Sequence, residues 1–212
     1  MNSLSACRKH KLFSALLLAA SVTVTLTAGA LAAEKAPAAH EAPKEKTAAA
    51  AMPEMPKPTA EHQWLQQFVG EWKSDAEAYM EPGKEPVRMT GTESVKPLGE
   101  FWTISEVKST MMDQPFTGNM TLGYDPKKKK YIGTWVDSMT GQLWEYEGTV
   151  DSTGKILTLN AEGSCPMNPG KMTKFKDVVE LKDKNTKVMT SSMLGEDGKW
   201  VTMMTSTAKR VD

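Results

Sequence analysis

Residues 116–137 read FTGNMTLGYDPKKKKYIGTWVD, and this stretch holds the pattern that decides the fold. Two strand-like segments, 116–124 and 130–137, are separated by the turn-forming run Tyr124-Asp125-Pro126. The four lysines 127–130 continue the turn, where a run of charge opposes pairing with other chains. A connection this short predicts antiparallel neighbours, because parallel strands need a long crossover.

The same pattern recurs on both sides of this hairpin, with breakers such as Glu81-Pro82-Gly83 between the segments. We expect strands at about 71–80, 87–96, 101–111, 116–124, 130–137, 142–150, 155–162, 172–182, 186–193 and 200–209. Ten sequential strands leave two sheet edges unless the sheet closes. We therefore predict an all-β, antiparallel up-and-down barrel, with a two-sheet sandwich as the alternative.

A short helix is predicted before the first strand. Thr59 is the expected N-cap, and His62 occupies the third helical position. The apolar face of this helix consists of Trp64, Leu65, Phe68 and Val69. Gly70 ends the helix, and the apolar period changes there from 3.6 to 2. No helix-length periodic segment follows, which argues against a βαβ fold.

The first 32 residues have the features of a secretory signal peptide. Arg8, Lys9 and Lys11 precede an apolar run, and Ala30-Leu31-Ala32 is a small-x-small cleavage pattern. We expect cleavage after Ala32 or Ala33, and a periplasmic or secreted protein with no integral membrane segment left. The alternative is a retained N-terminal anchor, because the apolar run is long enough to span a bilayer.

The segment 33–58 is rich in Ala, Lys, Glu and Pro and is predicted to be a disordered linker, which leaves residues 59–212 as the folded domain. Without residues 1–32, 23 basic residues face 26 acidic ones, a formal charge of −3. This balance does not indicate a nucleic acid or an anionic membrane surface as partner. Cys165 is then the single cysteine, so no internal disulfide is expected.

The domain resembles a known family. Gly70-Glu71-Trp72 is similar to the G-x-W signature of calycins, the class of lipocalins, fatty-acid-binding proteins and nitrobindin-like barrels. More specifically, the domain resembles the secreted domain-of-unknown-function family 1579 (DUF1579). The resemblance is carried by Phe116-Thr117-Gly118, by Leu122-Gly123-Tyr124-Asp125, by 131–138 and by Glu147-Gly148-Thr149. It implies a calycin-like barrel and no established activity.

Two further expectations come from this resemblance. Nitrobindin-like relatives hold haem through a late histidine, and here no histidine follows His62, so we expect no haem and no other cofactor. In lipocalins a late basic residue packs over the signature tryptophan. Arg210 is the candidate for that contact with Trp72, so Gly70, Trp72 and Arg210 form the expected structural signature.

The predicted strands mix small polar residues with large soft ones, as in Val188-x-Thr190-x-Ser192 and in Trp200-x-Thr202-x-Met204-x-Ser206. Such a lining suits a pocket for a small apolar or amphipathic ligand rather than a fully packed core. The predicted ligand-binding residues are Trp102, Trp135, Trp144, Tyr146, Phe175 and Met204. If Trp144 and Tyr146 face inward, Glu145 and Glu147 face solvent.

No catalytic motif is found, and we predict a non-enzymatic protein. His40 falls in the linker and His62 at the helix start, and no activating group lies near Cys165 in sequence. A carboxylate of raised pKa inside the barrel would argue for an enzyme instead. Two further hypotheses stay open: an envelope interaction module without a ligand, and a Cu(I) site. The copper hypothesis rests on 14 methionines after residue 32, which also suit an irregular pocket wall.

Overall fold

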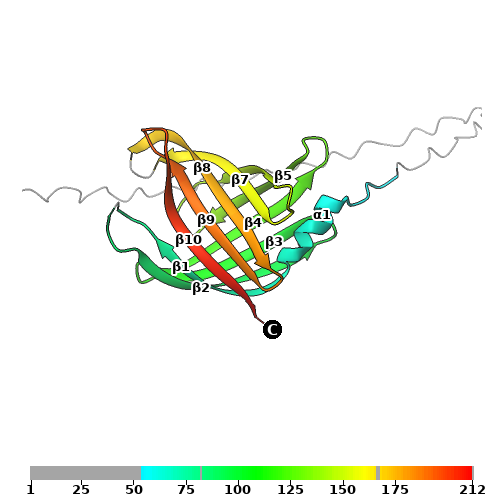
Figure 1. The fold of residues 1–212 in the computed structure, drawn as a ribbon, viewed down its shortest axis with the longest axis horizontal. Coiled ribbons are helices and arrows are strands. Elements are labelled where there is room, and N and C mark those ends of the chain that lie inside the picture. The colour runs from blue at the N-terminus through cyan, green and yellow to red at the C-terminus, as the bar shows by residue number, and fades with distance from the viewer. Residues whose placement is uncertain (1–53, 82, 166–167, 212) are drawn as a thin grey trace, which may run out of the picture. The chain divides into compact units, whose positions relative to one another are not determined.

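A computed structural model of the chain describes residues 54–81, 83–165 and 168–211 (Figure 1). The predicted signal peptide, most of the predicted linker, and His40 lie outside these residues. Ten strands form the domain: β1 Gly70–Ala78, β2 Val87–Leu98, β3 Trp102–Met111, β4 Gln114–Asp125, β5 Lys130–Asp137, β6 Trp144–Val150, β7 Ile156–Cys165, β8 Asn168–Asp183, β9 Thr186–Leu194 and β10 Trp200–Val211. The prediction of ten strands is confirmed.

The sheet closes on itself through its first and last strands. Each strand pairs antiparallel with its neighbours in sequence, and β1 also pairs with β10. Trp72 shows the closure directly, because it lies opposite Glu93 of β2 on one side and opposite Arg210 of β10 on the other. Closure removes both sheet edges, as the up-and-down barrel prediction requires. No helix among the described residues is long and apolar enough to cross a membrane.

A short helix lies against one end of the barrel (Figure 1). Helix α1 Ala60–Leu65 continues into the 3₁₀ turn η1 Gln66–Phe68. The backbone N–H of Thr59 donates to His62 Nδ1 at 2.9 Å, and His62 Nε2 lies 3.1 Å from the Tyr124 carbonyl oxygen. Trp64 Nε1 donates to the Gly154 carbonyl at 2.8 Å. Nδ1 of His62 therefore caps the helix, while Nε2 of His62 and Nε1 of Trp64 hold the helix to the barrel.

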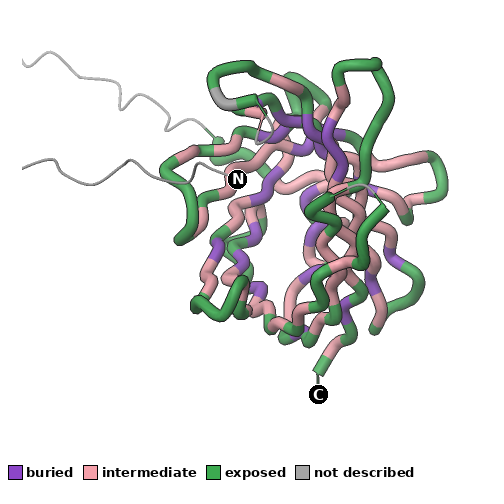
Figure 2. The backbone as a smooth tube through the Cα atoms, turned by 90° about the vertical axis from the view of Figure 1, so that its left-hand side faces the viewer, coloured by how far each residue is buried: buried purple, intermediate pink, exposed green. Residues whose placement is uncertain are grey.

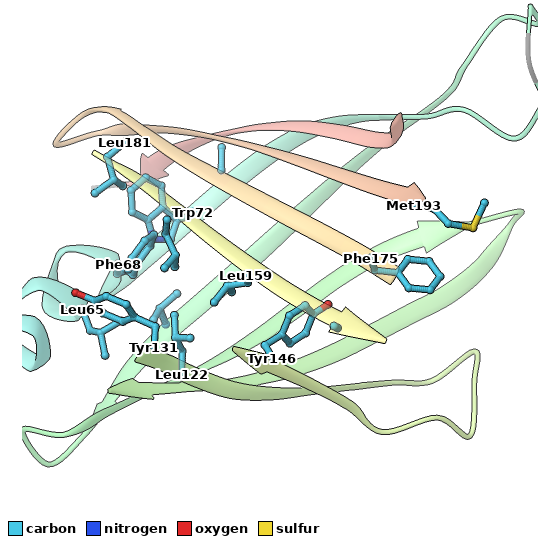
Figure 3. Packing of buried hydrophobic residues seen from close by; sticks show 14 residues of the cluster. Leu65, Phe68, Trp72, Leu122, Tyr131, Tyr146, Leu159, Phe175, Leu181 and Met193 are labelled. Atoms are coloured by element: carbon cyan, nitrogen blue, oxygen red, sulfur yellow. The ribbon is translucent and has the colours of Figure 1, made fainter. Parts of the chain in front are cut away.

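The densest packing is at this helix end. Leu65, Trp72 and Leu157 are 0%, 1% and 1% exposed, and Phe68 packs in the same cluster. Figure 3 shows Leu65, Phe68 and Trp72 next to the helix, with Phe175 and Met193 toward the other end of the barrel. Burial of large apolar side chains contributes about 1.5–3 kcal/mol each. The helix end is thus the main source of stability.

Gly70, Trp72 and Arg210 meet where the barrel closes. The Arg210 guanidinium lies 4.2 Å from the centre of the Trp72 ring, which is the contact expected from the sequence. Its Nη2 donates to the Gln67 carbonyl at 2.8 Å and its Nη1 to the Val69 carbonyl. Gly70 has a φ of +137°, and a Cβ there would lie 2.3 Å from Arg210 Nη1. Only glycine accepts both this backbone angle and this close approach.

Alternation along the strands separates an inner from an outer face, and the pairing register shifts at three places, in β10–β9, β7–β8 and β8–β9. The register of β10 against β9 shifts between Thr202 and Met204. This bulge puts Met204 and Ser206 on the inner face and leaves Trp200 outside, where Lys176 lies over its ring. On β9 the inner residues are the odd-numbered ones, so the expected inward face 188–190–192 is wrong. Glu145 and Glu147 face outward, as predicted.

We expect Gly70→Ala to lower the free energy of unfolding by about 2–4 kcal/mol, because the new Cβ meets Arg210 in a strained backbone conformation. Gly154→Ala is the matched control, since Gly154 has a φ of +72° and no atom within 4 Å of the position that a Cβ would take. This control should lose only about 1 kcal/mol. Urea unfolding of both variants measures the difference. Equal losses would show that the approach of Arg210 is unimportant.

Candidate ligand-binding site

Five of the six predicted ligand-binding residues share the inner face. Trp135, Trp144 and Tyr146 lie on β5 and β6, Phe175 lies on β8 and Met204 on β10. The sixth, Trp102, is outside: it alternates with the buried inner residue Thr103, and its ring covers Gly123 on the outer surface. Its aromatic character gives no information on which face it occupies, and it is not a lining residue.

The inner aromatic residues form two pairs. The Trp144 and Phe175 rings meet edge to face, with centroids 4.7 Å apart, and Phe116 stacks against Trp135 at 6.3 Å. These residues come from β4, β5, β6 and β8, so the pairs cover one side of the interior. We call Phe116, Trp135, Trp144 and Phe175 the aromatic wall. Edge-to-face and offset pairs of this kind are favourable and fix the ring orientations.

Two glycines hold the tryptophans of the aromatic wall against the sheet. A Cβ on Gly118 would lie 2.2 Å from the Trp135 ring, and one on Gly163 would lie 2.3 Å from the Trp144 ring. Each ring therefore occupies the space that a side chain on the neighbouring strand would need. The tryptophans lie along the wall instead of pointing across the interior, which reduces how much of the interior they fill.

Several inward residues at the end of the barrel away from the helix are only half-buried, although Phe175 and Met193 there are buried. Figure 2 views the barrel from the side away from α1, where the strands form a ring. In this half of the barrel several side chains are only half-buried although they point inward: Trp135, Trp144, Met204 and Ser206. An inward side chain keeps solvent exposure only where packing leaves room beside it. The interior half away from the helix is thus the candidate site.

Asp177 is the polar centre of this half, and the sequence patterns did not identify it. It lies on the inner face of β8, opposite Leu159 and Ser191, and its Oδ2 accepts a hydrogen bond from Tyr146 Oη at 2.8 Å. Its Oδ1 is buried and has no hydrogen-bond partner in the described structure. Asp177 alternates along β8 with the apolar residues Phe175, Val179 and Leu181. This alternation was the available signal that Asp177 points inward.

Burial raises the pKa of Asp177, and the hydroxyls of Ser191 and Tyr146 act against this shift. Burial also raises the pKa of Tyr146, and the neighbouring Asp177 charge adds to the increase. Tyr146 is therefore the proton donor of the pair. The arrangement can accept one further hydrogen bond at Asp177 Oδ1 from a group inside the barrel.

A buried ion pair lies on the helix side of this site. Lys187 Nζ is 2.6 Å from Glu93 Oε2 and 4.5 Å from the centre of the Trp72 ring. Burial lowers the pKa of Lys187, and the Glu93 carboxylate opposes that shift. Pairing offsets part of the cost of burying the two charges. This pair and the cluster around Trp72 close the interior toward the helix.

Several sulfur-containing side chains line the interior. The methionines on the inner face include Met89, Met120, Met189, Met193 and Met204. Cys165 Sγ approaches Met193 Sδ to 3.9 Å. No group of three His, Cys, Asp or Glu side chains suited to a metal occurs in the described part of the chain. The methionines therefore act as soft lining.

A separate groove of about 850 Å³ is present near the β1–β2 and β3–β4 hairpins. Most of its lining points outward, including Asp75, Glu77, Arg88 and Thr90, and Arg88 is already paired with Glu77 at 3.1 Å. The groove contains none of the predicted aromatic residues. Its exposed polar surface offers little apolar burial, so the interior remains the candidate site.

We expect Asp177→Asn to change how stability depends on pH. Because burial raises the pKa of Asp177 above its unfolded value, the folded wild type gains stability as pH falls through that pKa. The asparagine variant takes up no proton at this position. The free energy of unfolding of the variant should therefore exceed that of the wild type most near pH 7, and the difference should shrink toward about pH 4. Urea unfolding across this range tests it, with Glu145→Gln on the outer face as control. A constant difference would contradict the prediction.

Two solved structures and one family model are similar to this chain. The crystal structure of Rv2717c from M. tuberculosis is similar, with a TM-score of 0.53 and 11% identity over 74% of this chain and 100% of that chain. The S-type phycobiliprotein lyase CPES from Guillardia theta gives a TM-score of 0.49 and 12% identity, over 73% and 94% of the two chains. No curated protein matches. The model of the family described as "Protein of unknown function (DUF1579)" matches residues 57–210, and the chain, a calycin-like barrel, belongs to this family.

Proposed function

We propose that this protein binds a small apolar or amphipathic molecule inside its barrel, without transforming it. The observation that carries the proposal is the aromatic wall, whose tryptophans lie flat over Gly118 and Gly163 and stay half-buried. Large aromatic surface with room beside it favours apolar ligands, because contact removes that surface from water. The closed helix end gives such a site a floor.

The amount of polar surface in the site fits an amphipathic ligand. Ligand pockets are mostly apolar, with a few placed polar groups that fix orientation. Here Asp177 and Tyr146 supply those groups, while Met193 and Met204 add flexible apolar lining. The DUF1579 family has no assigned function, so the proposal rests on the geometry of the interior.

Enzymatic activity is the second candidate, because Asp177 is a buried carboxyl with a raised pKa. Acid–base chemistry also needs a reacting partner within hydrogen-bond reach. The bonded partner of Asp177 is Tyr146, whose own pKa is raised, and His62 is held by backbone groups at the other end. These contacts favour binding over catalysis. A ligand recovered chemically unchanged after incubation would support binding, and conversion would support an enzyme.

We expect Ser206→Trp to abolish ligand binding, because Ser206 points inward between Ala76 and Met189 and a tryptophan there fills the site. Thr207→Trp is the matched control, since the side chain of Thr207 points outward and lines the outer groove. Native mass spectrometry of protein purified from its own cells, followed by identification of the released molecule, measures the bound mass. Loss of the ligand in Thr207→Trp alone would move the site to the outer groove.

The wild-type spectrum also separates the competing functions. A stoichiometric organic mass supports the proposal and identifies the ligand class. A mass increment of one copper ion would favour Cu(I) bound near Cys165 and Met193. A bare protein mass, unchanged after exposure to a panel of lipids, would contradict the proposal and favour an interaction module.

We also propose that the protein is exported, with residues 1–32 removed. The basic residues before the apolar run and the Ala30-Leu31-Ala32 pattern support this. Intact mass and N-terminal sequencing of protein from the cell envelope should give Ala33 or Glu34 as the first residue. An uncleaved N-terminus in the membrane fraction would instead support a retained anchor.

A further inference from the structure

The charges inside the barrel are divided between its two ends. The basic inner residues Lys187 and Arg210 both lie against the Trp72 ring, at 4.5 Å and 4.2 Å. Lys187 is paired with Glu93, and Arg210 is bonded to backbone carbonyls. Both basic side chains of the interior are thus already bound to partners at the helix end.

The other half of the interior contains two acids, Asp177 and Asp137. Asp137 accepts hydrogen bonds from Trp135 Nε1 at 3.1 Å and from the backbone N–H groups of Met139 and Thr140, each at 2.9 Å. Among the described residues neither acid has a salt-bridge partner. This half therefore has a negative potential inside walls of low polarity, where charge interactions are strong.

Asp177 is the acid with a free position for a ligand. Tyr146 occupies Oδ2, the Ser191 hydroxyl lies near the carboxyl group, and the buried Oδ1 accepts no hydrogen bond of ordinary geometry in the part of the chain that the structure describes. Residues that share its surroundings are Leu159, Ser191 and Phe175, none of them basic. A buried carboxylate oxygen without a donor is costly, and a donor that carries positive charge relieves this cost most.

The aromatic wall favours the same kind of ligand. Cations are attracted to the faces of tryptophan and phenylalanine rings, most strongly where water is excluded. Trp144 and Phe175 both lie on the inner face, and Phe175 is two residues from Asp177 on β8. Resting on the function proposed above, we propose that the ligand is an apolar molecule with a terminal amine, whose ammonium group bonds to Asp177 Oδ1 while its apolar body contacts the aromatic wall.

This assignment ranks three ligands of equal length. Decylamine should bind most tightly, decanol less, and decanoate least, because its carboxylate meets Asp177 and Asp137 without a free basic partner. Affinities are measured by quenching of tryptophan fluorescence, on protein expressed as the full chain and purified from its cell envelope. We expect decylamine to bind at least about tenfold more tightly than decanoate. Tighter binding of decanoate would overturn the assignment.

The variant Asp177→Asn should weaken decylamine binding by about tenfold and change decanol binding by less than about threefold. Glu145→Gln, on the outer face of β6, is the matched control and should change neither. Thermal unfolding verifies that both variants fold. As a measurement on the wild type alone, decylamine affinity should fall as acid protonates Asp177, whose facing groups are Tyr146, Ser191 and, further out, Asp137. Affinity for decylamine that is unchanged in Asp177→Asn would overturn the assignment.

The two proposals fail in different ways. If decanol binds and Ser206→Trp abolishes that binding, but decylamine has no advantage, the amine assignment is wrong and the interior site stands. If none of the three ligands binds and the protein isolated from its own cells carries no organic mass, the interior site itself is wrong.

Discussion

The contacts of Arg210 connect the parts of the chain that close the barrel. Its guanidinium bonds to the carbonyls of Gln67 and Lys184 and lies over Trp72, so one side chain connects η1, the β8–β9 turn, β1 and β10. These segments are up to 143 positions apart in sequence. The G-x-W pattern follows from this contact: the glycine leaves space for the guanidinium, and the tryptophan supplies the surface under it.

The interior has two unlike halves because large apolar residues and an ion pair fill the half beside this closure. Beside α1, large apolar residues and the Glu93–Lys187 pair exclude water. Away from α1, glycines accommodate tryptophan rings, small residues such as Ser191 and Ser206 point inward, and a carboxyl oxygen of a described residue has no partner. The packed half supports a half that is less well packed, since closing the sheet gives every strand a hydrogen-bonded neighbour on both sides.

Sequence reasoning recovered the architecture because it depends on local signals. Turn residues and period-2 segments located all ten strands, and the break at Gly70 located the helix end. It was harder to predict which face of the sheet each residue occupies. The residue type of Trp102 suggests an inward position, although Gly123 beside it accommodates the ring outside. The bulge before Met204 reverses the parity of β10, and no residue pattern in that strand shows where an extra residue is inserted. Asp177 was missed because a single acid in an apolar strand resembles an outward position until the register is known.

The division between the two halves of the barrel has a consequence for how such a protein changes over generations. Inward side chains away from α1, such as Met189 and Met204, do not belong to the cluster of buried residues that contains Leu65, Trp72 and Leu157. Effects of distant, independent sites on stability are close to additive, so the stability margin of the helix end is available while the other half varies. A lineage with this barrel can therefore accumulate inward substitutions in the half away from α1 while the closing contacts of Arg210 stay unchanged.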